Sequence, residues 1–279
     1  MLRKTGIPSA LVATLALLGA AAPAHADWLL LNMPEGVTTM SGEIRSLHMN
    51  VLLWCTAIGV FVFGWMIVSL VKFRRSQGAV PDTTMVHSTK AEVIWTIIPV
   101  FILVIMAVPA ARTLIKLEDA SNSQLSIKVT GYQWKWQYEY LDEGVSFFST
   151  LDRASDAARQ LDSGVDPNSV PNYLLSVDNP LVVPVGRKVH VLLTSQDVIH
   201  SWWVPDFAIK KDAIPGVTNS VSFEVKADKP GTYRGQCAEL CGRDHGFMPV
   251  VVEAKLPADY AAWLAEQKQA AAQNLTAAN

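Results

Sequence analysis

Cysteine, histidine and methionine gather in one short stretch near the carboxyl end of the chain. Cys237, Cys241, His245 and Met248 lie within twelve residues, and the chain has only three cysteines. Two thiolates, an imidazole and a thioether are soft or borderline ligands, which favours copper over magnesium, calcium or manganese. Three glycines and a proline interrupt residues 235–249, so we expect the ligands to converge from a loop rather than from a helix.

Two other interpretations of these residues stay open at this point. Cys237 and Cys241 could form a disulfide, which is common in exported domains. Two cysteines and two histidines could also bind zinc, although zinc explains neither Met248 nor the absence of the two-residue cysteine spacing typical of structural zinc sites. Copper accounts for all four side chains.

The second cysteine indicates what kind of copper site to expect. A single-copper electron-transfer site uses one cysteine, two histidines and a weak axial methionine. Here two cysteines are present, so a second ion bridged by both sulfurs is the natural extension, and it requires a further histidine. His200 follows the apolar strand predicted from Lys188 onward, precedes an expected turn and supplies that second nitrogen, although a lone histidine is by default a packed core residue.

The first half of the chain has the composition of a membrane protein. Hydrophobic residues make up 50% of the chain and charged residues 17%. Residues 1–26 have the positive start, apolar centre and small-residue end of a cleaved signal peptide. Two uncharged runs follow, at about 49–71 and 93–111, each close to the roughly 20 apolar residues that cross a bilayer. We therefore expect residues 27–116 to form a two-helix transmembrane hairpin.

The loop between the two runs is basic, which places it in the cytoplasm and both mature termini outside. Glu92 lies at the cytoplasmic edge of the second run. A carboxylate at that depth is either a solvated flank or the mouth of a proton path, and the residues alone favour the flank.

Residues 117–279 change character and predict an all-β sandwich. Period-two segments occur at 125–130, 134–140, 188–193, 221–225 and 249–253, separated by glycine and proline turns. Residues 144–171 are typical of a long surface loop, and a terminal helix is expected from Pro257 to about Ala272. Alternation puts Trp134 on an aromatic face, either as sheet packing or as a relay above a redox centre.

These motifs together resemble subunit II of the bacterial cytochrome c oxidases, members of the haem–copper oxidase family, over nearly the whole chain. The resemblance implies a helical membrane hairpin joined to a cupredoxin-like Greek-key sandwich. It is carried by the copper loop and by four further motifs, which are Glu92-Val-Ile-Trp95-Thr-Ile-Ile-Pro99, Gly131-Tyr-Gln-Trp134-Lys-Trp136, Asp197-Val-Ile-His200-Ser-Trp202 and Asp212-Ala-Ile-Pro215-Gly216.

The resemblance also implies roles for single residues. Two copper ions would form a dinuclear CuA centre, bridged by Cys237 and Cys241. His200 and His245 would bind one ion each, and Met248 and the backbone carbonyl of Glu239 would be weaker ligands. The Glu239 side chain would reach a magnesium ion shared with subunit I, Trp134 would accept electrons from cytochrome c, and Glu92 would stand at the mouth of a proton channel.

The implied partners are subunit I with its haems and CuB, subunit III, cytochrome c and the lipid of a bacterial inner membrane, with the copper domain in the periplasm. We expect no nucleic-acid partner. Residues 117–279 carry 14 Lys and Arg against 20 Asp and Glu, which suits a basic donor. The acids singled out for docking are Asp142, Glu143, Asp178 and Asp197, for which an ordinary solvated surface is the alternative.

Three rival functions remain to be weighed. A quinol oxidase subunit II would share the hairpin and the sandwich but lack the copper ligands. A nitrous oxide reductase carries a similar loop within a much larger soluble enzyme. A structural membrane anchor would hold its two neighbouring cysteines as a disulfide.

Overall fold

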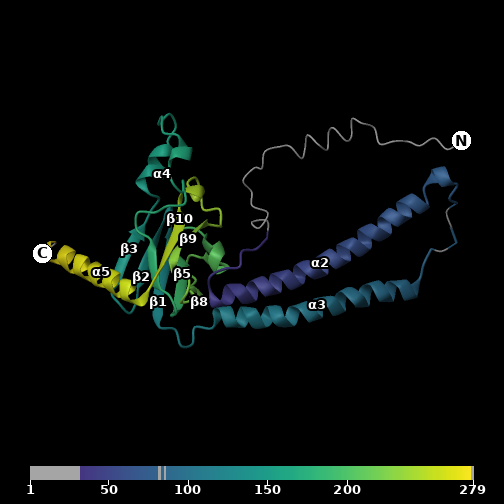
Figure 1. Cartoon of the computed structure of the whole chain (residues 1–279), viewed down its shortest axis with the longest axis horizontal. Coiled ribbons are helices and arrows are strands. Elements are labelled where there is room, and N and C mark those ends of the chain that lie inside the picture. The colour runs from purple at the N-terminus through teal and green to yellow at the C-terminus, as the bar shows by residue number, and fades with distance from the viewer. Residues whose placement is uncertain (1–31, 81–82, 85, 278–279) are drawn as a thin grey trace. The chain divides into compact units, whose positions relative to one another are not determined.

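The computed structural model describes residues 32–80, 83–84 and 86–277 of the chain (Figure 1). The chain divides into two units, Met1–Pro34 and Glu35–Asn279, and every element below belongs to the second. The predicted signal peptide, residues 1–26, lies outside the described residues.

Two long apolar helices come first. α2 (Thr39–Lys72) and α3 (Thr89–Glu118) contain windows with mean hydropathies of 2.3 and 2.6, and no residue of either window is buried within the chain. At 1.5 Å per residue, helices of this size are about 45–50 Å long, more than the roughly 30 Å of a bilayer core. Each helix therefore extends past the span predicted from sequence, and both are long enough to cross a membrane.

Local chemistry explains where α2 begins and why α3 continues past two prolines. Thr38 caps α2: its Oγ1 accepts a hydrogen bond from the Ser41 N–H at 2.9 Å, and Ser41 Oγ accepts one from the Thr38 N–H at 3.0 Å. α3 runs without interruption through Pro99 and Pro109, which membrane helices tolerate. The short 3-10 helix η2 (Arg75–Gln77) follows α2.

The remainder of the chain folds into two five-stranded sheets. The first has the order β3-β2-β1-β5-β8 and the second the order β4-β10-β9-β6-β7. The connections β3–β4, β4–β5, β5–β6, β7–β8 and β8–β9 pass between the sheets, as in a Greek key. The strands are β1 (Leu125–Tyr132), β2 (Lys135–Tyr140), β3 (Val145–Ser149), β4 (Leu181–Pro184), β5 (Lys188–Ser195), β6 (His200–Val204), β7 (Ile209–Ala213), β8 (Asn219–Glu224), β9 (Gly231–Cys237) and β10 (Pro249–Lys255).

The core of the sandwich follows from side-chain alternation. In β5, every second residue from Val189 to Ser195 is buried, and the residues between them are half-buried. Tyr140 ties the two sheets together: its hydroxyl donates to the Val182 carbonyl at 2.7 Å and accepts from the Val182 N–H at 3.0 Å. A tyrosine can be fully buried here because its polar end is satisfied.

Helical segments complete the domain. α5 (Pro257–Ala277) confirms the predicted terminal helix and packs Trp263 against Tyr140, with ring centroids 5.3 Å apart. The remaining segments are α4 (Arg153–Ala158), η3 (Pro167–Ser169), η4 (Pro205–Phe207) and η5 (His245–Phe247).

Three expectations about this half of the chain were wrong. The segment 144–171 is not one irregular loop, because it contains β3 and α4, whose N-cap Asp152 accepts from two backbone N–H groups. The aromatic strand begins at Lys135, so Trp134 lies in the β1–β2 turn rather than in the strand. His200 does not precede a turn, because it is the first residue of β6.

Candidate metal centre

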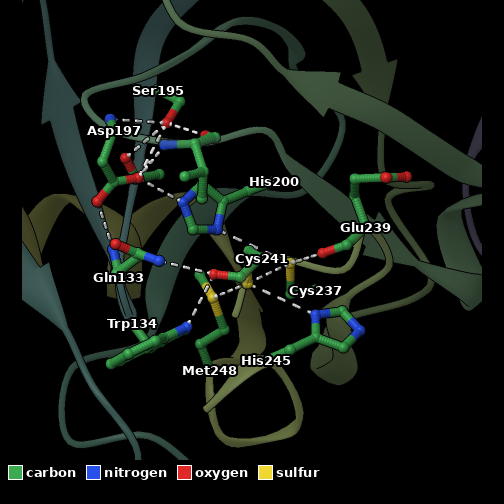
Figure 2. A network of polar contacts seen from close by, with 12 residues as sticks. Gln133, Trp134, Ser195, Asp197, His200, Cys237, Glu239, Cys241, His245 and Met248 are labelled. Atoms are coloured by element: carbon green, nitrogen blue, oxygen red, sulfur yellow. Dashed lines mark hydrogen bonds and ion pairs between the residues drawn. The ribbon is translucent and has the colours of Figure 1, made fainter. Parts of the chain in front are cut away.

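Three buried ligand-type side chains meet at one end of the sandwich (Figure 2). His200 begins β6, Cys237 ends β9, and Cys241 lies in the loop that follows β9. Their ligand atoms all lie within 4.8 Å of one another. The two sulfurs are 3.8 Å apart, and Cys237 Sγ is 4.0 Å from His200 Nδ1. Both cysteines are free thiols rather than a disulfide.

The other predicted ligands border the same sulfurs. Cys241 Sγ lies 3.5 Å from His245 Nδ1 and 3.5 Å from Met248 Sδ, and Cys237 Sγ lies 3.3 Å from the Glu239 carbonyl oxygen. Figure 2 shows this carbonyl directed at the sulfur, while the Glu239 carboxylate points away from it. The structure thus brings together all six residues that were predicted to form the metal site.

The donor set fits a thiophilic metal. Metal–sulfur and metal–nitrogen bonds are about 2.3 and 2.0 Å long, so one ion spans gaps of this size between a sulfur and a nitrogen. Because Cys237 and Cys241 are both buried, a cation bound to them is shielded from water. The thioether of Met248 adds a soft ligand that suits copper.

The two thiols differ in acidity. Burial alone would raise the pKa of Cys237, but contacts with His200 and with backbone groups of Ser201 and Glu239 outweigh it and hold that pKa below the ordinary value. Burial and the neighbouring Cys237 charge raise the pKa of Cys241. Since metal binding requires both thiolates, a bound cation would stabilise the charge that Cys241 cannot carry alone.

Asp197 orients the imidazole of His200. Its Oδ1 lies 2.8 Å from His200 Nε2, and its Oδ2 accepts a hydrogen bond from the Gln133 N–H at 2.7 Å. Burial alone would lower the pKa of His200, but the contacts with Cys237 and Asp197 outweigh it and raise that pKa above the ordinary value. With Nε2–H donating to the carboxylate, Nδ1 faces Cys237 with its lone pair free, an arrangement common among metal-binding histidines.

Gly131 supplies the room for this ring. It lies in β1, and a Cβ at this position would be 2.8 Å from His200 Cδ2. Sequence reasoning singled out neither Gly131 for this contact nor Asp197 for holding the histidine. A glycine inside a predicted strand was the available signal, since it often marks a close approach.

Trp134 is hydrogen-bonded to the loop that carries most of the ligands, residues 237–248, here called the ligand loop. Its Nε1–H donates to the Cys241 carbonyl at 3.1 Å, and Gln133 Nε2 donates to the same oxygen at 2.9 Å. Gly242 has a positive φ of 117°, and a Cβ there would be 3.0 Å from the indole ring. The half-buried indole therefore reaches the backbone of a metal-ligand candidate directly.

The four acids predicted for docking fall into two pairs. Asp178 accepts from the Thr150 N–H at 2.7 Å, just beyond β3, and Asp197 accepts from Gln133, so both lie near the Trp134 end of β2. Asp142 and Glu143 follow the other end of β2, about 20 Å away at the usual rise per residue. Glu143 is also paired with a lysine, Lys268, at 2.6 Å.

Glu92 lies away from this site, in the first turn of α3. Its Oε1 is 2.9 Å from His87 Nδ1, and both side chains are exposed.

Comparison with known proteins decides the family. The family "Cytochrome C oxidase subunit II, periplasmic domain" matches residues 125–255, and "Cytochrome C oxidase subunit II, transmembrane domain" matches residues 26–113. The chain belongs to the cytochrome c oxidase subunit II family. Members of this family are subunits of an oxidoreductase complex, and the complete donor set argues against the copper-lacking quinol oxidase alternative.

Two relatives that are similar in sequence agree with this assignment, and one solved structure is similar over the second half of the chain. A probable cytochrome c oxidase subunit 2 of Rickettsia bellii is 40% identical over 230 residues, which cover 82% of this chain and 81% of that protein. The cytochrome c oxidase subunit 2 of Chondrus crispus is 36% identical over 85% of this chain and 91% of its own. The solved periplasmic domain of subunit II (CoxB) from Bradyrhizobium japonicum is 38% identical and covers 54% of this chain and 98% of that one, with a TM-score of 0.45.

Proposed function

We propose that this chain is the electron-accepting subunit of a cytochrome c oxidase and holds two copper ions as a CuA centre. The observation that carries the proposal is the convergence of two buried free thiols with His200, His245 and Met248. When bound, the copper pair would supply a one-electron acceptor that reduces and reoxidises with little change in bond length.

The protein's own groups would prepare this site in three ways. Cys237 and Cys241 would provide both bridging thiolates, while His200 and His245 would each contribute Nδ1. Asp197 would keep the His200 ring in the tautomer that leaves Nδ1 free. The sandwich core around the ligands would exclude water and prevent large relaxation, which keeps electron transfer fast.

Electrons would enter at Trp134 from a c-type cytochrome. The indole N–H bonded to the Cys241 carbonyl supports this role, because it joins a half-buried aromatic ring directly to the ligand loop. Asp178 and Asp197 would meet a basic donor at this end of the sheet. Asp142 and Glu143, at the other end, would act mainly through long-range attraction, which weakens as salt rises.

The remaining roles concern the assembly. The Glu239 carboxylate, directed away from the sulfurs, would take part in a magnesium site shared with subunit I. Glu92, at the exposed start of α3, would receive protons for a channel into that subunit. Subunit I would carry the haems and CuB that reduce oxygen with proton translocation, and subunit III would complete the complex.

The same proposal places the chain in a bacterial inner membrane. After removal of residues 1–26, the hairpin within 27–116 would span the membrane, and residues 117–279 would lie in the periplasm. The basic residues of the α2–α3 loop support this orientation, because positively charged loops lie preferentially in the cytoplasm.

Rapid mixing of the assembled oxidase with reduced cytochrome c tests the proposal. Trp134→Phe should slow electron uptake measurably and leave bound copper unchanged. The change removes the indole N–H that bonds to the Cys241 carbonyl and reduces the ring area, but it alters no side chain that binds the metal. Trp263→Phe is the matched control, since Trp263 packs on α5 against Tyr140. Equal uptake rates in wild type and Trp134→Phe would contradict the proposed route.

A further inference from the structure

Between β3 and β4, residues 150–178 form an excursion with a defined shape. At its base, Leu151 pairs with Val177 in an antiparallel bridge. Inside it, the fully buried Ser155 Oγ accepts a hydrogen bond from the Leu174 N–H at 3.1 Å. The β3–β4 excursion is therefore closed at its base and braced within, so a side chain that extends from it has a firm support.

Arg159 extends from this excursion to the ligand loop, residues 237–248. Its Nε lies 2.7 Å from Asp156 Oδ1 in the excursion itself, and its Nη1 lies 3.6 Å from Asp244 Oδ1 in the loop. The guanidinium carbon also stands 4.4 Å from the centre of the Phe247 ring. Only 23% of the Arg159 side chain and 17% of the Asp244 side chain are exposed.

The two loop residues that Arg159 contacts are neighbours of two metal-ligand candidates. Asp244 directly precedes His245, and Phe247 directly precedes Met248. Contacts that hold the Asp244 and Phe247 side chains limit how far the adjacent ligand residues can move. Trp134, Arg159, Asp244 and Phe247 also line one recess of about 250 Å³, so the excursion, the loop and the indole meet there.

Arg159 supports the second half of the loop, beyond Cys241, where Gln133 and Trp134 hold the backbone. The loop contains two glycines, and its turn is braced from within by two short-range backbone bonds, from the His245 N–H to the Gly242 carbonyl at 3.3 Å and from the Phe247 N–H to the Asp244 carbonyl at 2.9 Å. Glycine gives the unrestrained chain many alternative conformations. A contact from a rigid neighbour lowers the population of open conformations.

A solvated surface ion pair would restrain the loop only weakly, because such pairs typically contribute less than about 1 kcal/mol. Arg159 differs in being mostly buried, in facing two carboxylates and in placing its flat group over an aromatic ring. Arginine, unlike lysine, can pair and stack with the same planar group. The geometry is that of a clamp between two segments far apart in sequence.

We propose that the β3–β4 excursion clamps the ligand loop, with Arg159 as the positioning residue that holds His245 and Met248 in place for the metal. The clamp itself is a property of the metal-free chain. Its effect on copper retention rests on the proposed function, so two separate measurements test the two parts.

Hydrogen exchange of the metal-free, full-length chain tests the clamp. In Arg159→Ala, the amides of His245 and Phe247 should exchange about tenfold faster, as expected for loss of a mostly buried ion pair together with a cation–π contact. The β5 amides serve as an internal reference and should not change. Arg153→Ala, which removes the same charge from an exposed position on α4, is the matched control. Equal exchange of these loop amides in Arg159→Ala and Arg153→Ala would overturn the clamp.

Copper release to a chelator tests the effect of Arg159 on copper retention. The copper-loaded full-length chain should lose its metal about tenfold faster in Arg159→Ala than in Arg153→Ala, and at an intermediate rate in Arg159→Lys, which keeps the charge but not the flat group. Release at the Arg153→Ala rate in both Arg159 variants would refute the role in retention. Failure of wild type to bind copper would instead reject the proposed function and leave the exchange test standing. Should Arg159→Ala unfold, Arg159→Lys carries both measurements.

Discussion

Substitution of Gly131 by alanine tests the metal centre at the position where β1 lies closest to the His200 ring. The new Cβ would stand 2.8 Å from His200 Cδ2, 3.0 Å from Cγ and 3.2 Å from Cβ, whereas ordinary contacts are 3.4–4 Å. The imidazole cannot simply rotate away, because Asp197 holds Nε2 at 2.8 Å and Trp136 packs against the ring at 5.8 Å between centroids. Either the ring or strand β1 must shift.

The shift required exceeds what a metal site accepts. Restoring an ordinary contact needs a displacement of at least 0.6 Å, whereas ligand distances in metal sites hold to within about 0.2 Å. Overpacking of this kind costs about 1–3 kcal/mol of folding free energy. Loss of ligand orientation typically lowers metal affinity about 10- to 100-fold. We expect both effects in Gly131→Ala, with the sulfur ligands still in place.

The assay is copper titration of the purified full-length chain, together with thermal unfolding of its metal-free form. Gly246→Ala is the matched control, since that glycine lies inside the ligand loop but a Cβ there would have no neighbour within 4 Å. Wild-type copper affinity in Gly131→Ala would refute the assignment of His200 as a ligand held against β1.

Three further predictions follow from the site and the core. Asp197→Ala should reduce copper affinity about 10- to 100-fold because the His200 ring loses the acceptor that orients it, and an unchanged titration would contradict this role. Met248→Leu should leave copper bound but shift the reduction potential measured by redox titration, because a thioether is a weak ligand; loss of the metal would be the opposing result. Burial and the Lys188 charge lower the pKa of His190, so its contribution to stability is present above the unfolded-state pKa and is lost as pH falls below it. The unfolding free energy of wild type should therefore fall more steeply than that of His190→Gln between about pH 7.5 and pH 5, and parallel curves would disprove the linkage.

The ligand set was predictable because it is local in sequence. Cys237, Cys241, His245 and Met248 are rare residue types within one loop, and the two apolar runs are long enough to identify a hairpin by composition alone. His200 could be added only because the donor set lacked a second nitrogen. Its position at the start of β6 could not be read from the sequence.

The strands β4 and β6 were not predicted from the sequence because both of their faces are buried. In β6 four of five residues are buried, and in β4 all four are, so the period-two signal of a half-exposed strand is absent. β9 contains two glycines and an exposed start, which obscures its alternation further. These segments become strands because of their packing between the sheets, and no local sequence pattern indicates that packing.

Sequence also cannot tell which carboxylates have internal partners. Asp197 and Glu143 look alike as surface acids, yet one orients a metal-ligand candidate and the other pairs with Lys268. For the same reason the sequence did not identify Arg159 as a contact of the ligand loop, because Asp244 lies about 85 residues away in sequence. Such pairings arise from tertiary contacts between distant segments.

The proposed centre consists of two copper ions that one chain binds through two shared thiolates. The most direct test measures copper content and electron uptake of the purified full-length chain, beside Cys237→Ser and Cys241→Ser. The thiols are reduced first, copper is then loaded, and the centre is oxidised before the uptake of electrons is measured. Each wild-type chain should bind two coppers and accept one electron, and either serine variant should lose this centre. A single copper per chain, or none with Cys237 and Cys241 joined in a disulfide, would contradict this proposal.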